Sequence, residues 1–272
     1  MIPVELCHYT RKDIALEKIL VDKKIKFSQL RFTNDPKDSM VRPLAYYDSD
    51  ISGDIETMNS KFKSIASKIE PLASKIQLDE WKVLCLTKNL KQRIPKNGNS
   101  SVFLKGYCRP HMWAQYADNN TGVCLIFDGN RLHENIKNYA IKEQCKIFYG
   151  SVSYKNFYTL LDYLNIQNFL KYGEKEIRDY YFKHYKEIFL AKYQDWKNES
   201  EFRWLIHNQM SSAEYVSIEG SLKAVLVGRD FPKVYEPALI EICKELKVSA
   251  GRMFWWFGEP HPRLDNIYKP KR

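Results

Sequence analysis

The sequence lacks the signatures of several common protein classes. No apolar run approaches the roughly 20 residues that span a bilayer, and the first residues do not combine a basic segment with an apolar one. There is no Gly-rich phosphate loop, no CxxC pair among the six cysteines, and no two of the six histidines stand at ligand spacing. We therefore expect a soluble, cytoplasmic protein with no membrane partner, and without a Rossmann fold, a disulfide framework or a metal site.

A strong positive charge and many aromatic side chains stand out among the 272 residues. Lys and Arg number 43 against 33 Asp and Glu, which gives a net charge of +10, and 14% of the residues are aromatic. A hydrophobic content of 44% predicts a globular core. The charge favours acidic partners such as nucleic acid or a nucleotide, although a solvated lysine-rich surface explains it equally well.

Apolar segments of two kinds, alternating and unbroken, predict strands interleaved with short helices. The strands are expected at 4–10, 24–28, 83–86, 123–127, 146–154, 201–206, 222–227 and 253–257. Helices are expected after Thr10, which with Asp13 has the spacing of a capping box, and at 111–118, 235–246 and within 54–79 and 156–194. Residues 88–110 are predicted to form a long loop. Because no regular βαβ rhythm is present, the pattern predicts an α+β fold with a mixed sheet. We expect one domain, 1–272, with helical insertions at about 54–79 and 156–194.

Residues 196–206 are the most informative for chemistry. Strand alternation separates apolar from charged side chains there, with Phe202, Trp204 and Ile206 on one face and Glu199, Glu201 and Arg203 on the other. Positions i and i+2 of a strand are roughly 6.6 Å apart, so Glu199 and Glu201 are placed to flank one substrate. Repulsion between them would raise the pKa of one carboxyl and suit acid–base chemistry. The alternative is a solvated strand face on which Glu201 and Arg203 only pair.

Two further groups of side chains are candidates for ligand binding. His8 and Thr10 share a strand face and offer an imidazole and a hydroxyl, although a histidine on an apolar strand is often a core residue. Trp113 and Tyr116 stand at i, i+3 on a helix and are able to stack on a planar ring, with core packing as the alternative. The aromatic run 253–257 suits base stacking or a buried strand.

Several of these segments together resemble a bacterial family known only as a domain of unknown function (number twenty-nine seventy-one). The matching pieces are CHYT at 7–10, FTNDP at 32–36, VLCLT at 83–87, MWAQYADNNTGVCLIFD at 112–128, VSY at 152–154, WKNESEFRWLI at 196–206 and LKAVLVG at 222–228. They follow the family's order, and the long piece at 112–128 is the most specific. The stretches 54–79 and 156–194 carry no recognised pattern.

That family in turn resembles a remote branch of the ADP-ribosyltransferase superfold. The resemblance implies a mixed split β-sheet with flanking helices, in which His8 and Thr10 hold NAD. It also implies that Glu201 is the catalytic carboxylate, and that Glu199 completes a Glu-x-Glu pattern that handles the acceptor.

The rest of the NAD site would consist of an aromatic side chain and basic side chains. The resemblance requires an aromatic side chain on the nicotinamide, and Tyr116 or Trp113 would supply it from a helix rather than from the usual strand. By position alone, Arg31 and Lys26 are expected to hold the pyrophosphate. A carboxylate held against the ribose would stabilise an oxocarbenium-like species without a metal.

The leading hypothesis is thus an NAD-dependent ADP-ribosyltransferase that modifies a nucleic-acid or protein acceptor. By resemblance it would be a bacterial toxin or a phage-defence effector, with an antitoxin or inhibitor as a further partner. A second hypothesis keeps the two carboxylates but makes the chain a hydrolase of NAD or of nucleic acid, a nuclease then requiring a metal. A third is a basic, non-enzymatic module that binds nucleic acid or a partner, with affinity that falls steeply with salt.

Overall fold

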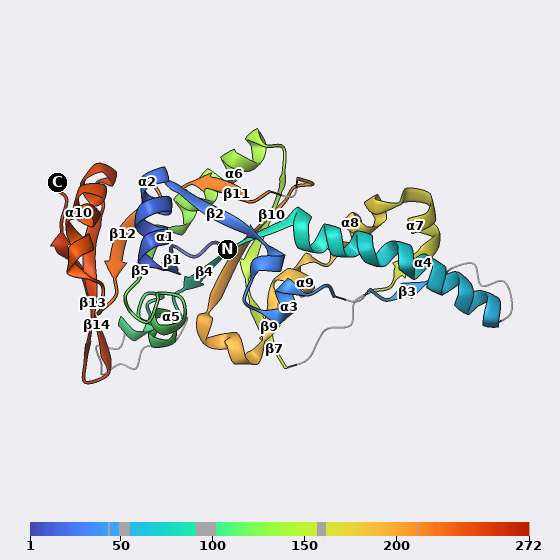
Figure 1. Ribbon diagram of the computed structural model, residues 1–272, viewed down its shortest axis with the longest axis horizontal. Helices are drawn as coiled ribbons and strands as arrows, with labels where there is room; N and C mark the ends of the chain where they lie inside the picture. Colours follow the sequence, from blue (N-terminus) through green and yellow to red (C-terminus); the bar gives the residue numbers. More distant parts are fainter. Residues whose placement is uncertain (43, 49–54, 91–101, 157–161, 211, 272) are drawn as a thin grey trace.

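A ten-stranded mixed sheet forms the centre of the computed structural model (Figure 1). The structure describes residues 1–42, 44–48, 55–90, 102–156, 162–210 and 212–271. Across the sheet the strands are β11 (Glu214–Ser217), β2 (Lys24–Gln29), β4 (Trp81–Lys88), β1 (Glu5–Thr10), β5 (Val123–Asp128), β12 (Leu222–Val227), β13 (Ser249–Trp256) and β14 (Glu259–Tyr268). β10 (Glu201–His207) pairs with β4 and with β6 (Lys146–Ser151). Within this sheet β12 and β13 are parallel, whereas its other described pairs are antiparallel. The α+β class and the mixed sheet are therefore as predicted.

Each strand expected from the sequence has a counterpart. The expected strand at 146–154 is divided into β6 and β7 (Ser153–Lys155), which pairs with β9 (Ala191–Tyr193) outside the main sheet. β3 (Tyr46–Tyr47) and β8 (Leu164–Asn165) form another small ribbon. The patterns did not predict β14 or β11, whose residues mix polar and apolar side chains without clear alternation.

The helix after β1 begins differently from the sequence prediction. It runs through α1 (Lys12–Ile14), a π-helical turn (Ala15–Ile19) and α2 (Leu20–Asp22), and its N-cap is Arg11, without a side-chain capping bond. The Thr10–Asp13 capping box is therefore wrong. Thr10 stays in the sheet opposite Val123, and the Asp13 carboxylate pairs with Arg11.

Two groups of helices pack against one face of the sheet. The predicted insertions contain α4 (Ile55–Lys75) and α7 (Ile166–Tyr172), α8 (Glu174–Lys183) and α9 (Tyr185–Phe189); residues 54 and 157–161 lie outside the described part. α4, α7 and α8 extend toward one end of the molecule in Figure 1, and all four helices share one apolar core with β4 and β10. The short α5 (Pro110–Gln115) packs instead under β1, β5 and β12. The predicted 88–110 loop is described only at its two ends.

The opposite face of the sheet carries the largest core. The π-helical turn Ala15–Ile19, α2, α6 (Gly129–Lys142) and α10 (Glu236–Leu246) cover it, and Phe202, Trp204 and Ile206 are buried there, as the alternation predicts. Within the described residues, no helix is both long enough and apolar enough to cross a bilayer.

One edge of β4 is shared between two strands, and this leaves a gap. β2 pairs with β4 at Lys82 and Val83, and β1 pairs with it at Thr87 and Lys88. In the described registers, residues 84–86 have no strand partner on that edge. The sheet is thus split beside Cys85, between the helices of the insertions and α5.

Candidate functional site

A cavity of about 210 Å³ lies at this split in the sheet. Its walls come from five of the segments that carry the family resemblance, together with Asp38 and Lys192. The lining residues are His8, Tyr9, Thr33, Asn34, Asp35, Asp38, Cys85, Leu86, Thr87, Met112, Tyr116, Lys192, Glu199, Glu201 and Arg203. Segments that are far apart in the chain therefore meet at one place.

Glu201 and Arg203 form the centre of a buried ionic network on β10. Arg203 Nε donates to Glu201 Oε1 at 2.7 Å, while the other end of the guanidinium binds both carboxylate oxygens of Asp38, at 3.0 and 2.6 Å. Asp38 belongs to α3 (Pro36–Ser39), which starts at the FTNDP turn because the Asp35 side chain caps it and Pro36 occupies its first position. The alternative of a solvated strand face is wrong, because Glu201 and Arg203 are only 4% and 1% exposed.

Glu199 approaches the same point from outside the strand. It ends a 3-10 segment (Gln194–Glu199), and Ser200 turns the chain into β10 with left-handed φ 49°. The expected i, i+2 strand geometry of the two glutamates is therefore wrong. They nevertheless converge, because Lys192 Nζ lies 2.8 Å from Glu199 Oε2 and 3.1 Å from Glu201 Oε2.

The electrostatics of the pair also differ from the prediction. Burial alone would raise the pKa of Glu201, but Arg203 and Lys192 outweigh it and lower that pKa to about 2. Burial likewise opposes the charge of Lys192, yet the neighbouring carboxylates, chiefly Glu201, raise its pKa. Glu201 is consequently an anion at neutral pH. We expected repulsion between the two carboxylates to raise the pKa of one of them. The Lys192 ammonium lies between them and offsets that repulsion.

His8 lines the cavity, and Thr10 does not. The imidazole Nδ1 of His8 lies 3.4 Å from the carbonyl oxygen of Cys85, on the unpaired stretch of β4, and burial lowers its pKa. A neutral ring that donates from Nδ1 leaves Nε2 as an acceptor for a ligand. Thr10 is buried two residues farther along β1, opposite Val123 of β5.

The two aromatic candidates separate in the same way. Tyr116 lies on the cavity wall and its hydroxyl donates to Glu199 Oε1 at 2.6 Å. Trp113 is fully buried beneath it, where its indole N–H donates to the carbonyl of Tyr107 and its ring packs edge-on against Tyr9. Of the two, only Tyr116 is in a position to touch a ligand in this cavity.

The expected pyrophosphate cations lie elsewhere. Arg31 forms an ion pair with Asp79 on the surface, and Lys26 projects from the exposed side of β2 opposite Tyr215. Neither lines the cavity. Sequence reasoning missed Lys192 and Asp38 as members of the site, although the resemblance did point to the neighbouring FTNDP turn.

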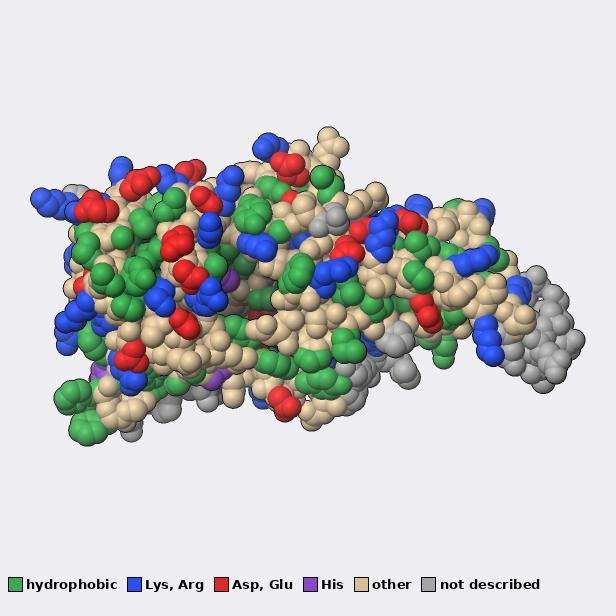
Figure 2. Space-filling model, viewed as in Figure 1, with side chains coloured by type: hydrophobic (Ala, Val, Ile, Leu, Met, Phe, Trp, Pro, Cys, Tyr) green, Lys and Arg blue, Asp and Glu red, His purple; other side chains and the backbone are tan. Residues whose placement is uncertain are grey.

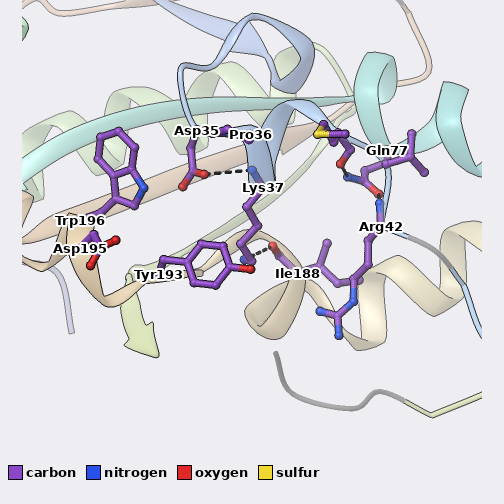
Figure 3. Close-up of a pocket in the computed structure, with 11 residues that line it drawn as sticks. Asp35, Pro36, Lys37, Arg42, Gln77, Ile188, Tyr193, Asp195 and Trp196 are labelled. Carbon is purple, nitrogen blue, oxygen red and sulfur yellow. Dashed lines mark hydrogen bonds between the residues drawn. The ribbon is translucent and has the colours of Figure 1, made fainter. Parts of the chain in front are cut away.

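A larger cavity, of about 720 Å³, adjoins the first (Figure 3). Trp196 and Asp35 lie toward one end of it and Arg42 with Gln77 toward the other, with Tyr193 and Lys37 between them. Apolar side chains complete the wall, namely Pro36, Met40, Val41 and Ile188. This cavity combines aromatic, apolar and cationic groups.

Asp35 lines both cavities and has an unused acceptor. Its Oδ1 accepts the backbone N–H of Lys37 at 2.9 Å, but Oδ2 is buried without a hydrogen-bond donor among the described residues. The nearest cation, Lys192 Nζ, is 4.0 Å away, which is too far for a hydrogen bond. A buried carboxylate oxygen in this state is suited to a ligand hydroxyl or amino group.

The family comparison agrees with the sequence resemblance over part of the chain. Residues 112–204 match the family described as "Protein of unknown function (DUF2971)", which confirms that resemblance for the stretch from α5 into β10. The comparison with curated proteins finds no match, and neither does the comparison with solved structures. Among the described residues, no cluster of three or more His, Cys, Asp or Glu side chains is arranged to hold a metal ion.

Proposed function

We propose that this protein, whose residues 112–204 match the DUF2971 family, is an NAD-dependent ADP-ribosyltransferase. The acceptor is a nucleic acid or a protein, and the biological role is that of a bacterial toxin or phage-defence effector in the cytoplasm. The observation that carries the proposal is the convergence of His8, Tyr116 and Glu201 around one cavity. These residues come from three distant segments, and the ADP-ribosyltransferase resemblance singled out each of them.

The sizes of the two cavities support a dinucleotide with two different ends. The smaller one, about 210 Å³, is below the roughly 300 Å³ at which pockets hold a drug-sized ligand, so it suits the nicotinamide riboside end. The larger one, about 720 Å³, takes the adenylate end, with Trp196 and Tyr193 beside the base. Arg42 and Lys37 then replace Arg31 and Lys26 as the cations for the pyrophosphate. A ribose hydroxyl satisfies the unused oxygen of Asp35.

The chemistry assigned to Glu201 is electrostatic. As the C1′–N bond to nicotinamide breaks, its electron pair leaves with the nicotinamide and positive charge develops on the ribose. Glu201 is already ionised and held by Arg203 and Lys192, so it stabilises that charge without rearrangement. A carboxylate accepts about four hydrogen bonds, which leaves room for a ribose hydroxyl besides these donors.

Glu199 and His8 have supporting roles in the same proposal. His8 accepts a ribose hydroxyl at Nε2 while its Nδ1 faces the Cys85 carbonyl. Glu199 takes the proton of the acceptor as that group attacks C1′, and the Tyr116 hydroxyl holds its carboxylate in place.

The test uses NAD labelled on the adenylate group. Purified protein is incubated with this NAD, alone and with total cellular protein, RNA or DNA. The wild type is expected to label one of these fractions, and Glu201→Gln is expected to lower the rate by at least a hundredfold, as removal of other preorganised electrostatic groups does. Glu80→Gln is the matched control, because Glu80 is equally buried in an ion pair, with Arg178, away from the cavity.

The outcomes separate the alternatives. Free ADP-ribose with no labelled fraction would favour an NAD glycohydrolase. Equal losses of labelling activity in Glu201→Gln and Glu80→Gln would show that Glu201 has only a structural role. Intact NAD with the wild type in every mixture would contradict the proposed activity.

A further inference from the structure

The β13–β14 hairpin presents aromatic side chains to solvent at its tip. Phe257 is 93% exposed and Trp256 is 66% exposed. Phe257 and Gly258 both have left-handed φ angles, 50° and 79°, as a tight two-residue hairpin turn requires. Hydrophobic side chains gather where this hairpin protrudes, at the lower left of the molecule (Figure 2). Contiguous exposed apolar groups are a feature of interaction surfaces.

The two faces of the hairpin have different compositions. Met253 is buried and Trp255 is partly buried, both in the core under α5. The opposite face carries three cross-strand pairs: Arg252 with Arg263, Phe254 with His261, and Trp256 with Glu259. Residues that lie directly opposite each other share a face, so exposed rings and basic groups alternate on it.

Two observations distinguish this face from a purely apolar patch. The guanidinium of Arg263 lies 5.5 Å from the centre of the Phe254 ring, so a cation accompanies the aromatic surface. Phe254 and Trp256 are separated by one strand repeat, roughly 6.6 Å, which sets two stacking surfaces in a row. Arg252 is committed to Glu236 and to backbone carbonyls, and Lys269 to Asp265, so Arg263 is the cation that accompanies the rings on this face.

This combination fits one class of ligand. Bases that are not paired in a duplex stack on aromatic rings, while basic side chains attract the phosphates between them. A duplex keeps its base faces covered, so it does not offer these groups. The net charge of +10 adds a general attraction for a polyanion.

We propose that the exposed face of the β13–β14 hairpin binds single-stranded nucleic acid. Successive bases stack on Phe254 and Trp256, and Arg263 contacts a phosphate. This binding does not rest on the proposed transferase activity, because it requires neither NAD nor the cavity. Where both are true, the hairpin narrows the acceptor to a single-stranded nucleic acid.

The experiment measures the fluorescence anisotropy of a short labelled oligouridine with the full chain, in the absence of NAD. Phe254→Ala and Trp256→Ala are each expected to weaken binding by about tenfold or more. Arg263→Gln should also reduce the dependence of affinity on salt. Tyr215→Ala is the matched control, since Tyr215 is 52% exposed on β11, at the other end of the sheet, and should leave the affinity unchanged.

Four results would overturn the inference. One is an unchanged affinity of Trp256→Ala, with its melting temperature equal to that of the wild type. The second is tighter binding of a duplex of the same length. The third is binding to phosphatidylserine vesicles that Trp256→Ala abolishes while RNA binding persists. The fourth is a dimer that Trp256→Ala dissociates, which would make the tip a contact between two copies of the chain.

Discussion

Lys192 is the residue on which the buried charges of the cavity depend. It lies between Glu199 and Glu201 and also approaches Asp35 at 4.0 Å, so one ammonium group is near three carboxylates. Its aliphatic chain and ammonium also sit beside the Trp196 ring, with Nζ 4.8 Å from the ring centre. The ion pairs of the small cavity and the aromatic wall of the larger one are thereby joined through a single side chain.

The lowered pKa of Glu201 predicts a specific pH dependence of stability. Its folded-state pKa is about 2 against an ordinary value of 4.5, so its stabilising contribution is complete above pH 4.5 and disappears as the pH falls toward 2. At pH 7, Glu201→Gln is expected to lower the free energy of unfolding by about 3 kcal/mol. Urea denaturation, followed by tryptophan fluorescence at several pH values, should show the difference from wild type shrinking below pH 4.5.

The control for this titration is Glu259→Gln, at an exposed glutamate of the hairpin. The free energy of unfolding of this variant should stay close to that of the wild type over the same pH range. If the difference in free energy of unfolding between Glu201→Gln and the wild type stays constant down to pH 2, then the ion pairs of Glu201 do not cause the pH dependence of stability.

At the scale of elements, β10 is a strand with two buried faces of opposite character. The apolar face packs in the large core, and the other face carries Glu201 and Arg203 under the insertion helices. Such a strand is held by packing on one side and by ion pairs on the other. Loss of either is expected to destabilise the fold, but only loss of the ion pairs changes the cavity.

Truncation of the apolar face isolates the packing contribution. Phe202 is 1% exposed, so Phe202→Ala is expected to lower the free energy of unfolding by about 3–5 kcal/mol. Chemical denaturation measures this directly, with Tyr215→Ala as an exposed aromatic control that should cost no more than about 0.5 kcal/mol. A Phe202→Ala protein as stable as the control would mean that the two faces of β10 are reversed.

The comparison of β10 with its sequence shows where prediction ends. Alternation fixed the apolar face correctly, because side chains alternate between the faces of any strand. It gave no information on what covers the charged face, since α8 and α9 come from a stretch without a recognised pattern. The partners Asp38 and Lys192 lie on other elements, and only tertiary packing brings them to Arg203 and Glu201. The same limitation applies to Arg31, whose actual partner, Asp79, is distant in sequence.

Over the whole molecule, two separate cores on one face of the sheet create the cavity between them. The core under α5 and the core under the insertion helices lie on either side of the split beside Cys85. The insertion helices are fixed to the sheet by apolar packing and by polar contacts. One polar contact joins Arg203 on β10 to the Phe189 carbonyl of α9. A second joins Arg178, on α8, to Glu80, whose Oε2 also lies 3.0 Å from His207 Nε2 on β10.

This attachment predicts an asymmetric pair of mutational effects. Arg178→Met leaves the Glu80 carboxylate, 1% exposed, with His207 as its remaining partner, so the free energy of unfolding should fall by about 3–5 kcal/mol. Adding Glu80→Gln to Arg178→Met removes the buried charge and should recover a large part of that loss. Thermal and urea unfolding of the two variants measure the difference. If the double variant is less stable than Arg178→Met, then the Glu80 carboxylate is solvated in Arg178→Met, and an unpaired buried charge does not explain the loss of stability.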